Sequence, residues 1–231
     1  MPVLYAIPTP LGGAAAEVLP ESVLRRVRSL EDFVAENAKS ARAFLTAAGA
    51  QPRAASIVEL NEHSDASGIE DMLQPLREGR DVGLVSEAGC PAIADPGAAL
   101  VEAAQREGFR VVPLVGPSSI LLALMASGLE GQRFAFCGYL PRNSAERARR
   151  IRELEARSRR ENETEIFIET PYRSDALLAA LVEACSPRTR LCVAADLTLA
   201  TESISTREVS EWKKQKAAIG RRPAVFLLLA Y

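Results

Sequence analysis

The sequence predicts an α/β protein with two domains, and three observations lead to this prediction. Short apolar runs alternate with helical patterns through the first half of the chain, which is typical of a mostly parallel sheet flanked by helices. In the second half the expected strands follow one another more closely, which indicates a mixed sheet with helices. The chain has 231 residues, 48% hydrophobic and 25% charged, and is long enough for two small folded domains.

The elements of the first half follow from the spacing of apolar residues. Short apolar runs predict buried strands, whereas apolar residues three and four positions apart predict helices. The expected strands are 3–7, 33–35, 56–60, 82–85 and 110–115. The expected helices are 20–30, 40–48, 69–77 and 96–107. Because strand and helix alternate, we expect a parallel sheet with helices on both sides.

The most informative stretch is the loop that follows the strand 82–85. Gly89 removes a side chain where a ligand could approach. Asp95 and Pro96 are expected to begin the next helix as its N-cap and its first helical residue. Open α/β sheets bind ligands where strands run into such loops, although a tight connection with an ordinary cap gives the same pattern. Similar transitions after the strand 110–115 and at the N-terminus favour a ligand site.

The segment 118–127 is almost wholly apolar, so we expect a helix that is buried on all sides and lies between two domains. This places an N-terminal α/β domain at 1–116 and a C-terminal α/β domain at 117–231. In the C-terminal domain, strands are expected at 133–137, 165–169, 191–195, 204–209 and 224–229, and helices at 143–160 and 176–185.

Charge and composition narrow the possible functions. The net charge of −2 gives no global basic field, so any nucleic-acid contact must use a local patch. The four cysteines form no CxxC pair and His63 is the single histidine, so we expect no metal site and a reducing compartment. No charged segment precedes the first apolar stretch, and the longest apolar runs are too short for a bilayer. We therefore expect a cytoplasmic protein without membrane contact.

Neither a GxGxxG fingerprint nor a Walker-type phosphate loop occurs, which argues against the common dinucleotide and nucleotide sites. Five other motifs resemble, in the same order, those of the tetrapyrrole methylase superfamily. They are Leu4–Gly12, Val85–Gly97, Val112–Ser119, Phe136–Pro141 and Glu169–Arg173. Within this superfamily they are most similar to the ribosomal RNA small subunit methyltransferases that act on a ribose 2′-hydroxyl.

The resemblance implies a two-domain tetrapyrrole-methylase-like fold with S-adenosyl-L-methionine in the cleft between the domains, and a homodimer. It implies a cytidine ribose of small-subunit ribosomal RNA as the acceptor, with that RNA or the small ribosomal subunit as partner. By resemblance, the residues that contact the methyl donor are Leu11, Cys90, Ile93, Ser118, Ser119, Ala195 and Pro223. The stretch 36–39 reads Glu-Asn-Ala-Lys where the family usually has Asp-Thr-Arg after the glutamate, so it departs on the acceptor side.

Methyl transfer is an in-line displacement that gains most from alignment and needs no metal. A hydroxyl acceptor also gains from a base that takes its proton. The candidates for this base are Glu36, Glu62 and Glu87, which lie at or just beyond the ends of expected strands. The alternative is that they are ordinary loop carboxylates and caps.

The expected helix 143–160 carries the strongest charge signal. Residues 142–160 include eight arginines and three glutamates. Arg147, Arg149 and Arg150 are the candidates for RNA contact, because clustered arginines bind phosphates. The alternative is a solvated helix with ion pairs such as the one expected between Arg149 and Glu153.

Three functions are therefore compared. The first is a methyltransferase that acts on ribosomal RNA, and it is favoured by the five motifs and the basic helix. The second is a methyltransferase of a small molecule such as a tetrapyrrole, whose carboxylates would also be attracted to arginine. The third is a non-catalytic cofactor-binding module, for which the altered stretch 36–39 is the support.

Overall fold

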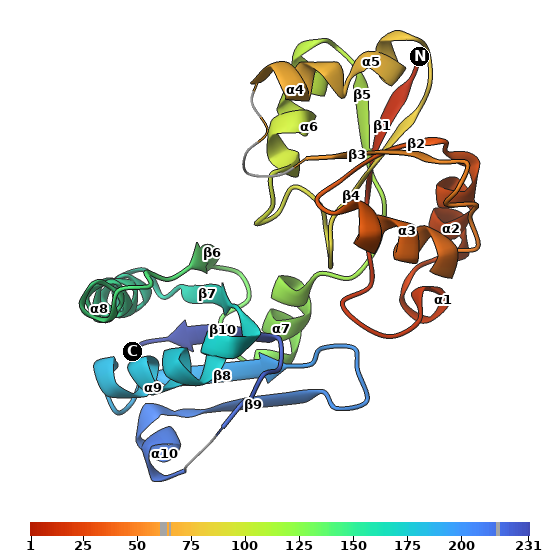
Figure 1. Cartoon of the computed structure of the whole chain (residues 1–231). Coiled ribbons are helices and arrows are strands. Elements are labelled where there is room, and N and C mark those ends of the chain that lie inside the picture. Colours follow the sequence, from red (N-terminus) through yellow and green to blue (C-terminus); the bar gives the residue numbers. More distant parts are fainter. Residues whose placement is uncertain (61–63, 65, 216–217) are drawn as a thin grey trace. The chain divides into compact units, whose positions relative to one another are not determined.

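Two five-stranded sheets, each with its own helices, make up the structure (Figure 1). The computed structural model describes residues 1–60, 64, 66–215 and 218–231. The chain separates into two units, unit 1 at 1–118 and unit 2 at 119–231. The predicted fold class is confirmed, because one sheet is parallel, the other is mixed, and helices accompany both.

The sheet of unit 1 is wholly parallel, with strand order β3-β2-β4-β1-β5. Its strands are β1 (Val3–Ile7), β2 (Asp32–Ala35), β3 (Ser56–Glu59), β4 (Val82–Val85) and β5 (Arg110–Pro113). In the middle of the sheet, Tyr5 lies opposite Gly83 on one side and Val112 on the other. A Cβ atom at Gly83 would lie 2.7 Å from the Phe33 ring, so the glycine allows this ring to pack on the sheet.

The helices of unit 1 cover both faces of this sheet. They are α1 (Ala15–Val18), α2 (Glu21–Ser29), α3 (Ala38–Ala47), α4 (Ala66–Asp71), α5 (Gln74–Arg77) and α6 (Gly97–Arg106). One buried cluster joins α2 and α3 to the sheet, and a second joins α5 and α6 to it. The single helix expected at 69–77 is instead divided into α4 and α5. Pro75 accounts for the break, because it lacks an N–H and fits only the first turn of a new helix.

The sheet of unit 2 is mixed, with strand order β6-β7-β10-β8-β9. Its strands are β6 (Phe134–Tyr139), β7 (Thr164–Glu169), β8 (Arg190–Ala195), β9 (Ser203–Glu208) and β10 (Ala224–Leu229). β6 is parallel to β7, whereas β10 is antiparallel to both β7 and β8. β9 forms the expected antiparallel pair with β8.

Helices α7 (Ser119–Ser127), α8 (Ser144–Glu161), α9 (Ser174–Ala184) and α10 (Val209–Lys214) complete unit 2. α8, α9 and α10 share one buried cluster with the sheet, in which the rings of Phe167 and Phe226 are stacked. α7 packs against β8, β9 and β10. Within the described ranges, no helix combines the length and the apolar character needed to cross a bilayer.

The expectation that α7 is buried on all sides is wrong. Ala123 and Leu124 of α7 are buried, but the side chain of Leu121 is 50% exposed and that of Met125 is 80% exposed. One side of the helix therefore packs on the sheet and the other remains at the surface. An apolar sequence indicates that a helix can be buried, but it does not indicate which side of the helix packs against the sheet.

Candidate functional site

Three loops meet at the carboxyl edge of the parallel sheet. Thr9, after β1, and Gly89, after β4, form a backbone bridge with N···O distances of 2.9 and 3.1 Å. The Ser86 hydroxyl donates to the Gly89 carbonyl oxygen at 3.0 Å. The Cys90 thiol donates to the carbonyl oxygen of Pro117, after β5, at 3.5 Å. These bonds tie together the loops that follow three neighbouring strands, β1, β4 and β5.

Two glycines let the backbones of these loops approach one another. A Cβ atom at Gly116 would lie 2.4 Å from Cβ of Pro8, a distance that real side chains do not adopt. Gly89 has φ +81°, and a Cβ atom there would lie 3.3 Å from the Leu11 side chain. The loops therefore need glycine at both positions, for close packing at Gly116 and for a left-handed backbone at Gly89.

The loop after β4 also carries backbone strain. Ala92 and Ala94 have φ values of +65° and +63°. Alanine in this region costs on the order of 1 kcal/mol, and such strain is concentrated at functional sites. Oδ1 of Asp95 accepts hydrogen bonds at 2.8 Å from the backbone amides of Ala92 and Gly97, which holds the strained turn in place.

The same residues correct the predicted start of α6. The helix begins at Gly97, and Pro96 occupies the N-cap position rather than the first helical turn. Asp95 nevertheless supplies an acceptor to the Gly97 amide, because its side chain reaches over the proline. Its second oxygen, Oδ2, is buried without a hydrogen-bond partner, and burial raises the pKa of Asp95. A buried acceptor without a donor is a place where a ligand can complete the loop.

The donor-contact residues predicted in unit 1 lie on these tied loops. The Leu11 side chain lies 3.3 Å from where a Cβ atom of Gly89 would be, and the Cys90 thiol is hydrogen-bonded to the Pro117 carbonyl oxygen. Ile93, between the two strained alanines, is 49% exposed. Ser118 ends unit 1, and Ser119 begins α7 in unit 2. Their role in binding stays a prediction.

Two of the three candidate bases lie on neighbouring strand ends. Glu36 follows β2 and Glu87 follows β4, and these strands pair up to Ala35 and Val85. Burial raises the pKa of Glu36, and the charges of Glu87 and Asp95 raise it further. The Ser40 hydroxyl donates to Oε1 of Glu87 at 3.0 Å. Glu62 and the single histidine, His63, lie outside the described residues.

Unit 2 has a second strained loop, which follows β8. Asp196 has φ +54° and Thr198 has φ +71°, which is a rare conformation for a β-branched residue. The Asp196 amide donates to the Pro223 carbonyl oxygen at 3.0 Å, so Pro223 and Ala195 are adjacent. Oδ2 of Asp196 accepts from the Thr201 hydroxyl at 2.9 Å. Sequence reasoning named Ala195 and Pro223 but missed the strained residues, which no pattern of residue types marks.

The fifth motif anchors the start of α9. The Glu169 carboxylate is buried at the end of β7 and forms an ion pair with Arg173 at 2.8 Å. Its Oε1 accepts from the Thr170 amide at 2.8 Å. The motif therefore has a clear structural role in joining β7 to α9.

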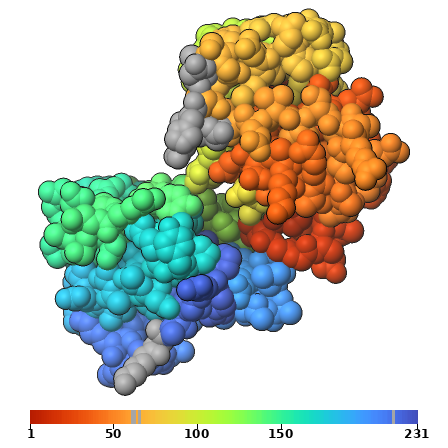
Figure 2. All heavy atoms as spheres, viewed as in Figure 1, coloured from red at the N-terminus to blue at the C-terminus, as the bar shows by residue number. Residues whose placement is uncertain are grey.

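The basic helix α8 lies at the surface of unit 2, in the green to turquoise part of Figure 2. The Asn143 side chain caps it by accepting from the amides of Ala145 and Glu146. Both Arg149 and Arg150 lie near Glu153, at 3.7 and 3.3 Å. The expected Arg149–Glu153 pair is therefore present, and contact of the helix with RNA stays a prediction.

Arg147, the third predicted RNA contact, has a different environment. Its Nη1 donates to the Arg142 carbonyl oxygen at 3.2 Å, while its Nε is buried without a hydrogen-bond partner.

Within the ranges that the structure covers, no group of three or more histidine, cysteine or acidic side chains could hold a metal ion.

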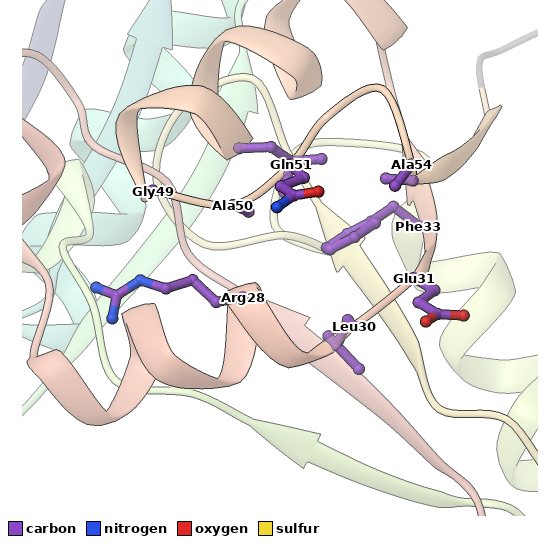
Figure 3. Close-up of a pocket in the computed structure, with 10 residues that line it drawn as sticks. Arg28, Leu30, Glu31, Phe33, Gly49, Ala50, Gln51 and Ala54 are labelled. Atoms are coloured by element: carbon purple, nitrogen blue, oxygen red, sulfur yellow. The ribbon is translucent and has the colours of Figure 1, made fainter.

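A hollow of about 270 Å³ lies at the opposite edge of the parallel sheet (Figure 3). Phe33 and Leu45 contribute apolar surface to it, and Gln51 contributes an amide. Arg28 is already engaged there, because its Nε donates to the Ala48 carbonyl oxygen at 2.8 Å. This hollow is at the amino ends of the strands, so it is separate from the tied loops.

Comparison with known proteins decides the family. Residues 3–212 match the family of Tetrapyrrole (Corrin/Porphyrin) Methylases. The chain belongs to the tetrapyrrole methylase family. The predicted family is therefore confirmed, and this tetrapyrrole methylase is a methyltransferase.

Its relatives include proteins named Ribosomal RNA small subunit methyltransferase I. The relative from Neisseria meningitidis serogroup B is 35% identical over 219 residues, which cover 95% of this chain and 72% of that protein. The relative from Escherichia coli O157:H7 is 33% identical over 215 residues, which cover 92% of this chain and 72% of that protein.

Solved structures of two methyltransferases share the tetrapyrrole methylase fold. The methyltransferase CobJ has a TM-score of 0.66 at 20% identity, covering 100% of this chain and 95% of that one. The cobalt precorrin-4 methyltransferase CbiF has a TM-score of 0.64 at 17% identity, covering 98% and 94%. At this identity the likeness concerns the fold alone.

Proposed function

We propose that this tetrapyrrole methylase transfers a methyl group from S-adenosyl-L-methionine to a ribose 2′-hydroxyl of small-subunit ribosomal RNA. The observation that carries the proposal is the identity of 33–35% to the ribosomal RNA methyltransferases over more than nine tenths of the chain. The five sequence motifs support methyl transfer, and the ribosomal acceptor rests on the similarity to these relatives.

The tied loops of unit 1 fit such a donor. The tied loops pack closely at Gly89 and Gly116, which fixes the positions of their peptide groups, and Oδ2 of Asp95 is a buried acceptor without a hydrogen-bond partner. The residues proposed to hold the donor are Leu11, Cys90, Ile93, Ser118 and Ser119, and the same resemblance adds Ala195 and Pro223 of unit 2. When bound, S-adenosyl-L-methionine supplies the activated methyl group.

Glu36 is the proposed base for the acceptor hydroxyl. Its raised pKa makes its carboxylate a stronger proton acceptor than an ordinary glutamate. Glu87 lies beside it and contributes negative charge, which is one cause of the raised pKa. A carboxylate oxygen of Glu36 would take the proton from the hydroxyl oxygen as that oxygen bonds to the methyl carbon. The methyl–sulfur bond of the donor would break in the same step, and its electron pair would leave with the neutral thioether S-adenosylhomocysteine.

We also propose that α8 contacts the RNA backbone through Arg147, Arg149 and Arg150, and that the protein is a cytoplasmic homodimer. Arginines on one exposed helix suit phosphate contacts. The exposed apolar side chains of Met125 in α7 and Phe134 in β6 are available for a contact between two copies.

Calorimetric titration with S-adenosylhomocysteine, the product of the donor, is the first test. We expect binding at micromolar or better affinity. A Gly89→Ala variant should weaken it, because alanine is strained at φ +81° and crowds Leu11. Gly79→Ala is the matched control, because Gly79 has φ +86° but no atom within 4 Å of the added Cβ and lies outside the loops. Absence of binding by the unaltered chain would contradict the proposal.

A transfer assay then identifies the acceptor. Labelled methyl groups should appear on the ribose of unmodified small-subunit ribosomal RNA, and not on transfer RNA. Transfer to a tetrapyrrole instead would favour a small-molecule acceptor. Donor binding without transfer to any acceptor would indicate a non-catalytic module.

A further inference from the structure

A second hollow of unit 1, of about 480 Å³, runs along β5 on the side of the sheet that faces α2. Val112 and Leu114 of the β5 segment line it together with Tyr5 of β1 and Val23 of α2. We call this hollow the β5 groove. Its volume is within the range of small-molecule and nucleotide pockets, about 300–1,000 Å³.

The charged side chains that line the β5 groove are positive. Arg26 and Arg110 line it, and none of the described residues that line it is acidic. Asp81 lies beside the groove, with Oδ2 4.0 Å from Arg26, but its Oδ1 already accepts from the Val3 amide at 2.8 Å. The groove therefore favours an anionic ligand with an apolar part.

Arg26 presents a flat surface inside this groove. Its guanidinium carbon lies 4.5 Å from the centre of the Tyr5 ring, which is the geometry of a cation–π contact. The Arg26 side chain is still 41% exposed, so part of it remains accessible to a ligand in the groove. Guanidinium planes held in this way stack with nucleobases in RNA complexes.

The backbone of β5 excludes an added peptide strand as the occupant. The Leu114 amide donates to the Ala6 carbonyl oxygen, so the even-numbered residues of this strand bond to β1. Pro113 then lies at a position whose backbone faces outward, and it has no N–H to donate. A proline at that position prevents regular pairing with another strand, which leaves side-chain recognition as the mode of binding.

We propose that the β5 groove binds one nucleotide of an RNA strand. The base stacks on the outer face of Arg26, and Arg110 pairs with a phosphate of the same strand. The apolar floor at Val112 and Leu114 contacts the base edge and the sugar. This inference rests on the proposed RNA acceptor and adds a second RNA contact, on a different unit from α8.

The test uses the full chain and two probes, cytidine 5′-monophosphate and a fluorescent single-stranded RNA of eight nucleotides that contains 4-thiouridine. Arg26→Ala should weaken RNA binding about tenfold, because stacking of one base is lost. Arg26→Lys should weaken it almost as much, because lysine keeps the charge but not the planar surface. Arg110→Glu should weaken it without disturbing the Tyr5 contact.

Arg25→Ala is the matched control, because Arg25 is exposed on the same helix but does not line the groove. It should bind RNA as the unaltered chain does. Photocrosslinks from 4-thiouridine should map to peptides that contain residues 20–26 or 110–115. Thermal melts by circular dichroism establish that each variant is folded.

Each result bears on the proposal. Unchanged RNA affinity in both the Arg26→Ala and Arg110→Glu variants overturns it. If only the affinity for cytidine 5′-monophosphate falls, the groove takes free nucleotides, and the RNA assignment is overturned. Absence of RNA binding by the unaltered chain also overturns it, whereas titration with S-adenosylhomocysteine reports separately on the donor site.

Discussion

Glu36 of unit 1 and Glu165 of unit 2 are glutamates with opposite electrostatic surroundings: Glu165 is paired with an arginine, whereas other acids raise the pKa of Glu36. Glu165, in β7, is 0% exposed, and its Oε1 accepts from Nε of Arg157 at 2.6 Å. Glu36, at the end of β2, has the carboxylates of Glu87 and Asp95 as charged neighbours. A buried charge with a matched cation serves the structure, whereas an acid among other acids is suited to exchange protons.

The surroundings of Glu165 complete this contrast. Its Oε2 accepts from a second nitrogen of Arg157 and lies 3.2 Å from Sγ of Cys137. Burial and the neighbouring Glu165 charge raise the pKa of Cys137 to about 11, so the thiol stays neutral and can donate. This network joins α8, β6 and β7, and it holds the basic helix on the sheet.

The largest expected effect comes from replacing Glu36, the acid whose pKa is raised by other acids. Glu36→Gln should lower the rate of methyl transfer by about 10² to 10⁴, because an amide cannot accept the proton. A labelled-methyl assay with ribosomal RNA measures this rate. Glu31→Gln, an exposed glutamate just before β2, should leave the rate unchanged. Equal rates for Glu36→Gln and the unaltered chain would remove Glu36 from the mechanism.

The pH dependence of the same variant tests the raised pKa. Folding favours the protonated form of Glu36, so this group stabilises the fold fully below its usual pKa of 4.5. That contribution is lost as the pH rises through the higher pKa of the folded state. Glu36→Gln should therefore be more stable than the unaltered chain at pH 7, with a difference that shrinks below pH 4.5. Urea unfolding at both pH values measures it.

The next largest effect is a loss of stability when Glu165 loses its ion-pair partner, Arg157. Arg157→Ala should lower the free energy of unfolding by about 3 kcal/mol, because it leaves the buried Glu165 charge without its partner. Urea unfolding measures the change. Arg160→Ala is the control, since Arg160 pairs with Glu161 at the surface and should change stability by less than about 1 kcal/mol. A similar small change for Arg157→Ala would show that water compensates Glu165.

A smaller effect, on RNA affinity, is expected when charges of the basic helix α8 are reversed. Arg149→Glu combined with Arg150→Glu should weaken RNA binding about tenfold in moderate salt and lower the slope of log affinity against log salt by about 2. Donor binding should not change. Arg106→Glu, which reverses one charge on α6 of unit 1, is the control. RNA affinity that persists in the double variant would leave the β5 groove as the main contact.

The smallest effect concerns the backbone strain in the loop after β4. Ala92→Gly should stabilise the fold by about 1 kcal/mol, because glycine adopts φ +65° without cost. The same change should weaken binding of S-adenosylhomocysteine, because the loop becomes less rigid. Ala47→Gly in α3 should instead destabilise the chain, since it introduces glycine into a helix. If Ala92→Gly stabilises the fold without weakening the binding of S-adenosylhomocysteine, the strain at Ala92 does not contribute to binding.

Much of this fold could be predicted because apolar runs mark buried strands directly. The predicted bounds of the strands 3–7, 82–85 and 224–229 agree with β1, β4 and β10. α10 was missed because it has only six residues and begins where the strand 204–209 was expected to end. Its capping box between Glu208 and Glu211 was the signal that could have located it.

The site was only partly predictable, for a physical reason. The three loops could be named from their glycines and prolines, whereas the hydrogen bonds of Thr9 and Cys90 that join them are seen only in the structure. The proximity of Glu36 to Glu87 depends on β2 pairing with β4, which is a matter of strand order rather than of local sequence. The strain at Ala92 and Thr198 could not be predicted, because neither residue type favours a left-handed backbone.

The strand order of unit 1 has a consequence for how the chain is made. Among the strands of this sheet β1 is synthesised first, but it pairs with β4 and β5, and Val3 lies opposite Arg110. Contacts between such distant segments form late, and an apolar strand without partners is prone to aggregate. Every nascent chain that ends before β5 therefore carries Val3–Ile7 with at least one edge unpaired, and the sheet is complete only when β5 has left the ribosome.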